Sequence, residues 1–131
     1  MPYGGAITPI SETDATGRVK EIFDEIKKVR GLGEVPLIFR IMAHIPMYLE
    51  TSWQRIRFAL EQDGRLERKT KWMVALAISA SNNNKAMILE STDRLKALGA
   101  TDQEIAELMS VVDVTNGLNK AMKAAQVAYA E

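Results

Sequence analysis

The chain has 131 residues, of which 47% are hydrophobic and 26% charged, a composition typical of one globular domain spanning residues 1–131. Seventeen basic side chains balance seventeen acidic ones, so no large net charge is available to attract nucleic acid or an anionic membrane. The chain contains no cysteine and His44 is its only histidine, which excludes disulfides and thiolate chemistry and argues against a metal site.

Apolar residues spaced three and four apart predict a first helix from about Thr16 to Arg30. Gly31 is suited to end it, because glycine tolerates the left-handed backbone of a helix C-terminus. A short second element is expected from Pro36 to His44. Pro46 then begins a third helix, whose apolar positions continue to the Asp63-Gly64 turn.

The segment from Leu66 to Ala80 is apolar nearly all round, which predicts a central helix surrounded by others. Three asparagines, residues 82–84, can cap a fifth helix that continues through Leu98 and closes at Gly99. This half of the chain is therefore expected to be helical as well.

Thr101 and Glu104 form a capping-box pattern, in which each side chain satisfies an amide of the first turn, so a sixth helix begins there. A last helix is expected from the spacing of Leu118, Met122 and Ala125. No run alternates with the period of a strand. The sequence therefore predicts an all-α bundle of about six or seven helices.

Three segments, read in order, resemble the carboxymuconolactone decarboxylase and alkylhydroperoxidase-D family. The first is Gly17 to Ile26 followed by Val35 to Pro46, the second is Val74 to Asn83 with its continuation Leu95 to Ile105, and the third is Val114 to Asn119. With their spacing, the resemblance covers about residues 15–125. It implies a helical fold and a homo-oligomer, a trimer or hexamer, in which helices of neighbouring subunits complete the pocket.

Peroxidase members of this family use a C-x-x-C pair, a following histidine and an earlier glutamate. The resemblance places the two cysteine positions at Asn84 and Met87, the histidine position at Ser91 and the glutamate position at Trp72. Peroxide reduction of this kind needs a thiolate nucleophile. The chain is therefore not expected to be a thiol peroxidase.

Asn84, Met87 and Ser91 are spaced three and four apart and so share one helix face. Amides at a helix start and the nearby polar side chains can hold a carboxylate, because the helix dipole places partial positive charge there. The expected binding residues are Asn83, Asn84, Lys85, Met87, Ser91 and Trp72. The alternative interpretation is a helix cap followed by a core face.

No catalytic residue is assigned, and His44 and Ser91 are the candidates. An imidazole titrates near neutrality and can act as a general base, but His44 can equally hold the turn before Pro46 through a carbonyl.

The function predicted from these residues is binding of a small organic acid or similar metabolite, with at most non-redox chemistry and without a cofactor. The alternatives are a structural or regulatory oligomer and a decarboxylase or dehalogenase-like enzyme. No stretch approaches the roughly 20 apolar residues that cross a bilayer, and the first residues lack the features of a signal peptide. A cytoplasmic protein that contacts neither membrane nor nucleic acid is expected.

Overall fold

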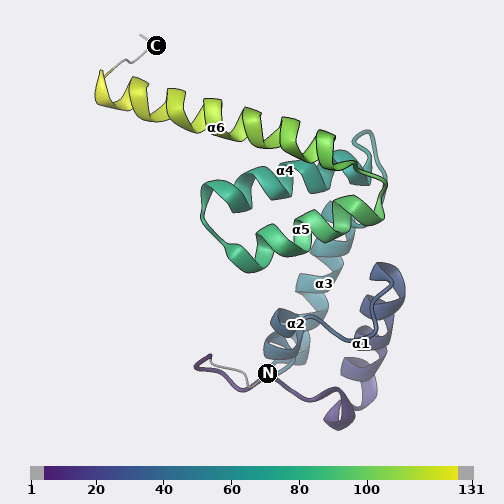
Figure 1. Cartoon of the computed structure of the whole chain (residues 1–131). Helices are drawn as coiled ribbons and strands as arrows, with labels where there is room; N and C mark the ends of the chain where they lie inside the picture. Colours follow the sequence, from purple (N-terminus) through teal and green to yellow (C-terminus); the bar gives the residue numbers. More distant parts are fainter. Residues whose placement is uncertain (1–4, 127–131) are drawn as a thin grey trace. The chain divides into compact units, whose positions relative to one another are not determined.

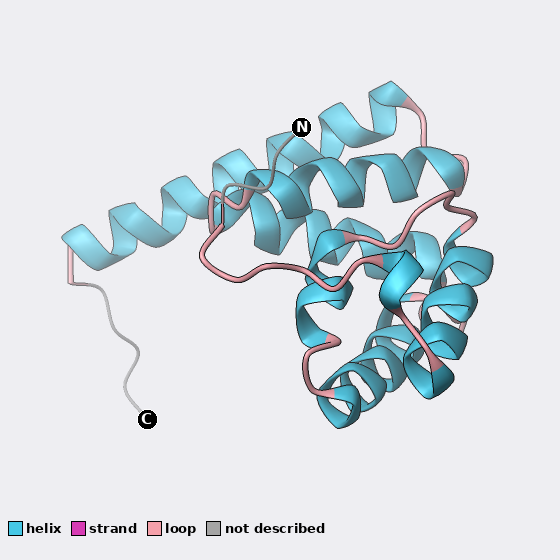
Figure 2. Cartoon of the chain, turned by 90° about the horizontal axis from the view of Figure 1, so that it is seen from below, coloured by secondary structure: helices cyan, strands magenta, loops and turns pink. Residues whose placement is uncertain are grey.

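The computed structural model describes residues 5–126, and within that range all regular structure is helical (Figures 1 and 2). The all-α prediction is confirmed. The chain divides into two compact units, Met1–Gln62 and Asp63–Glu131, which we call the N-terminal and C-terminal units. The N-terminal unit contains η1 (Glu12–Asp14), α1 (Gly17–Arg30), α2 (Leu37–Met42) and α3 (Pro46–Leu60), and the C-terminal unit contains α4 (Arg68–Ser81), α5 (Lys85–Ala97) and α6 (Asp102–Ala124). None of the described helices is both long and apolar enough to cross a membrane.

The core of the N-terminal unit forms where α1 and α2 pack against α3. The rings of Phe39 and Trp53 meet edge to face, with their centroids 5.6 Å apart and their planes at 87°. The apolar stripes that the sequence predicts on the first and third helices are the faces buried here. The core comprises Ala15, Ile22, Phe23, Ile26, Val35, Phe39, Ala43, Leu49 and Trp53.

Two expected helix boundaries of this unit are confirmed. Gly31 follows α1 with a φ of 65°, the left-handed conformation that a side chain would strain, and Pro46 occupies the first turn of α3. Between these points Glu12 fixes the loop that leads to α2. Its carboxylate accepts the Val35 amide at 3.0 Å and pairs with Lys27 Nζ at 2.9 Å, and these contacts hold the pKa of Glu12 below its usual value.

A charged pair lies inside the N-terminal unit. Arg30, in the last turn of α1, has its Nε 3.3 Å from Oε1 of Glu61, which caps the end of α3; their side chains are 3% and 0% exposed. The Arg30 guanidinium also lies 5.4 Å from the ring centroid of Phe39 and 6.0 Å from that of Trp53. The apolar core is therefore built around an ion pair that helical periodicity does not reveal.

In the C-terminal unit, α4 packs against both α5 and α6. Trp72 and Leu76 of α4 and Leu95 of α5 are buried. The predicted capping box is confirmed: Glu104 N donates to Thr101 Oγ1 at 3.1 Å, and Thr101 N donates to Glu104 Oε1 at 3.0 Å. Together with a 2.8 Å contact to Lys69, the box lowers the pKa of Glu104.

The expectation of two separate C-terminal helices is wrong, because α6 runs without interruption from Asp102 to Ala124. Gly117 lies inside it without a positive φ, and an internal glycine costs only about 1 kcal/mol relative to alanine, which is too little to break the helix. Figure 1 shows α6 extending well past α4 and α5.

The expectation that α4 is surrounded by other helices is also not met within the described part of the C-terminal unit. Val74 and Ile78 are 52% and 56% exposed. The helix is apolar on a side that neither α5 nor α6 covers, so hydrophobic periodicity alone could not distinguish burial inside one chain from exposure.

Candidate functional site

The six residues predicted to bind a ligand, which we call the α5 site, lie on α5 and the turn before it, except for Trp72, which lies on α4. Asn84 is the N-cap residue of α5: its Oδ1 accepts the Met87 amide at 3.1 Å. Asn83 precedes it with a φ of 55°, a conformation that asparagine tolerates better than most residues, and Lys85 is exposed. The asparagine cap that the sequence predicts is thus present.

Two members of the α5 site lie much deeper. Ser91 on α5 and Trp72 on α4 are each 0% exposed and belong to the buried sides of two helices that pack together. Ser91 Oγ has no hydrogen-bond partner among the described residues. Asn83 and Lys85 do not join this layer, so the predicted residues divide into an exposed helix start and a buried floor farther along α5, with partly buried Met87 between Asn84 and Ser91 in the sequence.

Sequence reasoning missed Arg94, which lies three residues after Ser91 and shares its buried side of α5. Its guanidinium lies 5.8 Å from the ring centroid of Trp72, within the range of a cation–π contact. The floor of the α5 site therefore holds a cation, an indole and a hydroxyl. Each of these groups can donate a hydrogen bond, so the floor is better suited to binding than to proton transfer.

The other catalytic candidate, His44, belongs to the N-terminal unit. Its Nε2 donates to the Thr8 carbonyl at 2.5 Å. Just before Pro46, the imidazole therefore ties the N-terminal segment to the α2–α3 turn, which corresponds to the structural interpretation of this residue.

Two grooves of the C-terminal unit are lined by neighbours of the predicted residues. One, of about 310 Å³, is almost entirely apolar; on α5 it uses Ile88 and Thr92, each of which follows a member of the α5 site by one position. The other, of about 400 Å³, runs between α4 and α6, where Asn116 Nδ2 donates to Ser81 Oγ at 3.1 Å. Neither groove is lined by a member of the α5 site.

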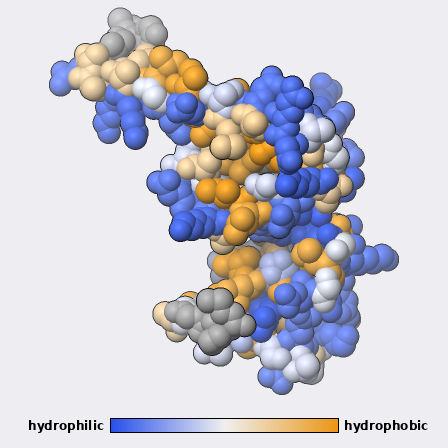
Figure 3. Space-filling model, in the orientation of Figure 1, coloured by the Kyte–Doolittle hydropathy of each residue, from blue (hydrophilic) through white to orange (hydrophobic). Residues whose placement is uncertain are grey.

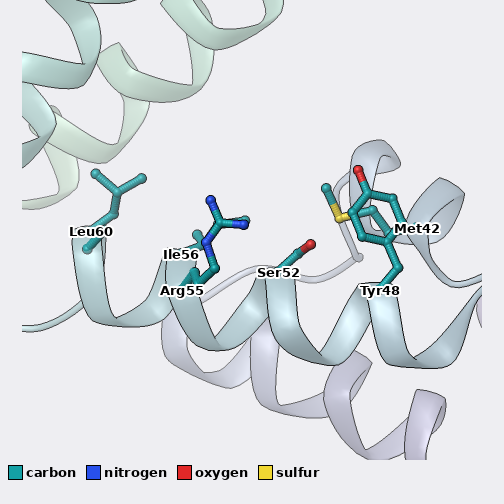
Figure 4. A pocket seen from close by; sticks show the side chains of 7 residues that line it. Met42, Tyr48, Ser52, Arg55, Ile56 and Leu60 are labelled. Atoms are coloured by element: carbon teal, nitrogen blue, oxygen red, sulfur yellow. The ribbon is translucent and has the colours of Figure 1, made fainter.

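A third groove, of about 380 Å³, lies along α3 in the N-terminal unit, and we call it the α3 groove. Figure 4 shows Tyr48, Ser52 and Arg55 projecting from one side of α3, with Met42 of α2 beside the tyrosine ring. These three residues are not among those that the sequence predicts to form a site. The available signal was their helical spacing and the absence of an acidic residue three or four positions from Arg55. The groove is lined by Met42, Tyr48, Ser52, Arg55, Ile56, Ala59 and Leu60.

Within residues 5–126, no three histidine, cysteine, aspartate or glutamate side chains gather as a metal site would require.

Comparison with known proteins gives two matches. The family model described as the carboxymuconolactone decarboxylase family matches residues 48–130, which takes in most of α3 and the whole described part of the C-terminal unit. The crystal structure of the alkylhydroperoxidase AhpD core from Rhodospirillum rubrum is similar over 98% of this chain and 96% of that chain, with a TM-score of 0.89 and 25% sequence identity. No curated protein sequence matches the chain.

Proposed function

This chain belongs to the carboxymuconolactone decarboxylase family, and on that premise we propose that it binds a small organic acid at the α5 site, with at most non-redox chemistry. The chain contains no cysteine, so it cannot act as a thiol peroxidase. The α5 site consists of the helix start capped by Asn84 and the buried hydroxyl of Ser91. These features suit recognition of a ligand rather than a redox cycle.

The observation that carries the proposal is the buried hydroxyl of Ser91. A buried polar group without a partner costs about 1–3 kcal/mol, and most such groups in folded proteins are satisfied. Ser91 Oγ is fully buried and has no partner in the part of the chain that the structure describes. In the complex, a ligand oxygen would supply the missing hydrogen bond. In the protein without ligand, a water molecule that the ligand displaces would supply it. Met87, the flexible side chain between Asn84 and Ser91 on the same face, would have to move aside.

Charge at the start of α5 favours an anion. The Asn84 side chain caps the helix through its Oδ1, which leaves its Nδ2 free to donate outward. The amides of Lys85 and Ala86 belong to the first turn, where an α-helix provides no acceptor, and the helix dipole adds partial positive charge. The Lys85 ammonium completes a set of donors that matches a carboxylate.

Asn84→Asp separates the cap from the ligand contact. Aspartate caps a helix as well as asparagine does, so stability should change little, but it removes the amide donor and adds a negative charge. We expect at least about tenfold weaker binding of a small acid. The measurement is a calorimetric titration with succinate and muconate, each chosen first by its effect on the melting temperature of the wild-type protein.

Two comparisons control this experiment. Asn119→Asp makes the same chemical change on α6 and should leave binding unchanged, whereas Ser91→Ala should weaken binding without loss of stability. If no acid in the panel binds the wild-type protein, or if Asn84→Asp binds as tightly as the wild type, acid binding at the α5 site is wrong. The alternatives would then be a structural or regulatory role and a decarboxylase or dehalogenase-like activity.

We further propose that the chain assembles with copies of itself, as a trimer or hexamer. Val111, Val114 and Leu118 are spaced three and four apart on α6 and are 60%, 59% and 56% exposed. Figure 3 shows apolar surface on the projecting part of this helix. Contiguous exposed apolar surface of this kind marks association sites more often than isolated apolar residues do.

Val114→Asp is expected to lower the assembled fraction strongly, because burying a carboxylate in an apolar contact is costly. Sedimentation velocity at several protein concentrations measures the effect. Lys120→Glu also adds acidic charge to α6, but at a position that is already charged, and should leave the assembly intact. A wild-type protein that sediments as a monomer at all concentrations would contradict the proposal.

A further inference from the structure

The α3 groove has one charged lining residue, Arg55, in the middle of its length. Tyr48 lies about two turns before Arg55 and Ser52 one turn before it, so the phenol, the hydroxyl and the guanidinium follow one side of the helix (Figure 4). Neither Ser52 nor Arg55 has a hydrogen-bond partner among residues 5–126. Three kinds of hydrogen-bond donor therefore face the same groove.

Arg55 differs from the other arginines of the N-terminal unit. Arg18 pairs with Glu50 and Glu21, Arg57 pairs with Glu25, and Arg30 pairs with Glu61. Arg40 donates its Nε to the Ile10 carbonyl at 2.8 Å. Arg55 is thus the arginine of the described part of the unit for which the structure shows no partner at any nitrogen, so its whole planar donor fork is available to a carboxylate.

The rest of the groove is apolar. Its wall is built from the side chains of Met42, Ile56, Ala59 and Leu60 together with the ring of Tyr48. A volume of about 380 Å³ lies within the range of small-molecule sites, which combine apolar walls with a few polar groups that fix orientation. The groove therefore has a cationic side and an apolar side, each large enough for part of one small ligand.

We propose that the α3 groove is a second binding site, for a monocarboxylate with an apolar body. The carboxylate pairs with the Arg55 guanidinium and accepts hydrogen bonds from the Tyr48 and Ser52 hydroxyls. The apolar body lies on Ile56 and Leu60. A single cation favours a monoanion, because a phosphate or a dicarboxylate would bring a second negative charge that no other lining residue neutralises.

The probe for this proposal is 3-phenylpropionate, which combines one carboxylate with an aromatic body. Titration into the full chain, followed by amide chemical shifts, should give saturable changes at Tyr48, Ser52 and Arg55. Arg55→Gln should weaken binding by about 10- to 100-fold, since hydrogen bonds to a charged group contribute that much. Because Arg55 is exposed and lies on a helix surface, this variant should fold normally.

Two controls isolate the recognition of the carboxylate. The neutral amide 3-phenylpropanamide should bind at least about tenfold more weakly than the acid. Arg57→Gln removes the same charge from the same helix, but outside the groove, and should bind the probe as the wild type does. Shifts confined to other helices, equal binding of acid and amide, or unchanged binding by Arg55→Gln would each overturn the proposal. Saturable shifts at the same residues with inorganic phosphate alone would show a general anion site and would also overturn it.

This site does not depend on the α5 site. The variants Asn84→Asp and Ser91→Ala should bind 3-phenylpropionate at the α3 groove with unchanged affinity. Arg55→Gln, in turn, should leave intact any acid binding at the start of α5. Either site can therefore fail its test while the other passes.

Discussion

Glu61→Leu is expected to lower the free energy of unfolding by about 3–5 kcal/mol, because it leaves the charge of Arg30 buried without its carboxylate. The side chains of Arg30 and Glu61 are 3% and 0% exposed, and Arg30 Nε lies 3.3 Å from Glu61 Oε1. Water therefore cannot readily replace the lost partner. A loss of this size is a large fraction of the 5–15 kcal/mol that typically stabilises a domain.

The matched control is the double variant Arg30→Met, Glu61→Leu. Replacing both members of a buried pair by apolar side chains of similar size is often neutral or stabilising, so the double variant should recover most of the loss. Urea unfolding followed by circular dichroism measures all three proteins. A single variant as stable as the wild type would show that the pair is solvated in solution, and a double variant as unstable as the single would show that packing, rather than charge, causes the loss.

Trp72→Ala is expected to lower the free energy of unfolding by about 3–5 kcal/mol as well, for a different reason. Trp72 is the largest of the fully buried side chains, and its removal leaves a cavity that the surrounding helices fill only in part. Thermal unfolding gives the shift in melting temperature. Val74→Ala, on the exposed side of the same helix, should change stability by no more than about 0.5 kcal/mol.

The size of the Trp72 effect also bears on the α5 site. A full loss means that the indole fills the space beside Arg94, so a ligand can bind only between Asn84 and Ser91. A loss below about 1 kcal/mol would indicate room around the ring, contrary to its complete burial.

Much of the fold could be predicted because its signals are local. The capping box at Thr101, the glycine that ends α1 and the proline in the first turn of α3 each act within a few residues. The continuity of α6 could not be read in this way, since a glycine inside a helix and a glycine after one look alike in sequence. The exposure of one side of α4 could not be predicted, because an apolar side chain can be buried either within its own chain or against another chain.

The candidate sites also combine local features that the sequence predicts with long-range features that only the structure shows. The cap at Asn84 follows from residue type and position, and the structure contains it. The ion pair of Arg30 and Glu61 joins residues from two helices that are far apart in the sequence, so no periodicity predicts it. Arg55 became noticeable only when the structure showed that neighbouring arginines have glutamate partners and that it faces a groove.

The length of α6 has a consequence for the order of its last turns. At 1.5 Å per residue, its 23 residues extend about 34 Å, whereas α4 and α5, with 14 and 13 residues, extend only about 20 Å. About two-fifths of α6 is therefore in excess of the length of either helix of its own unit. Short helical segments without packing are marginal in water. The end of α6 is therefore expected to fray more readily than the part beside α4, unless another surface packs against it.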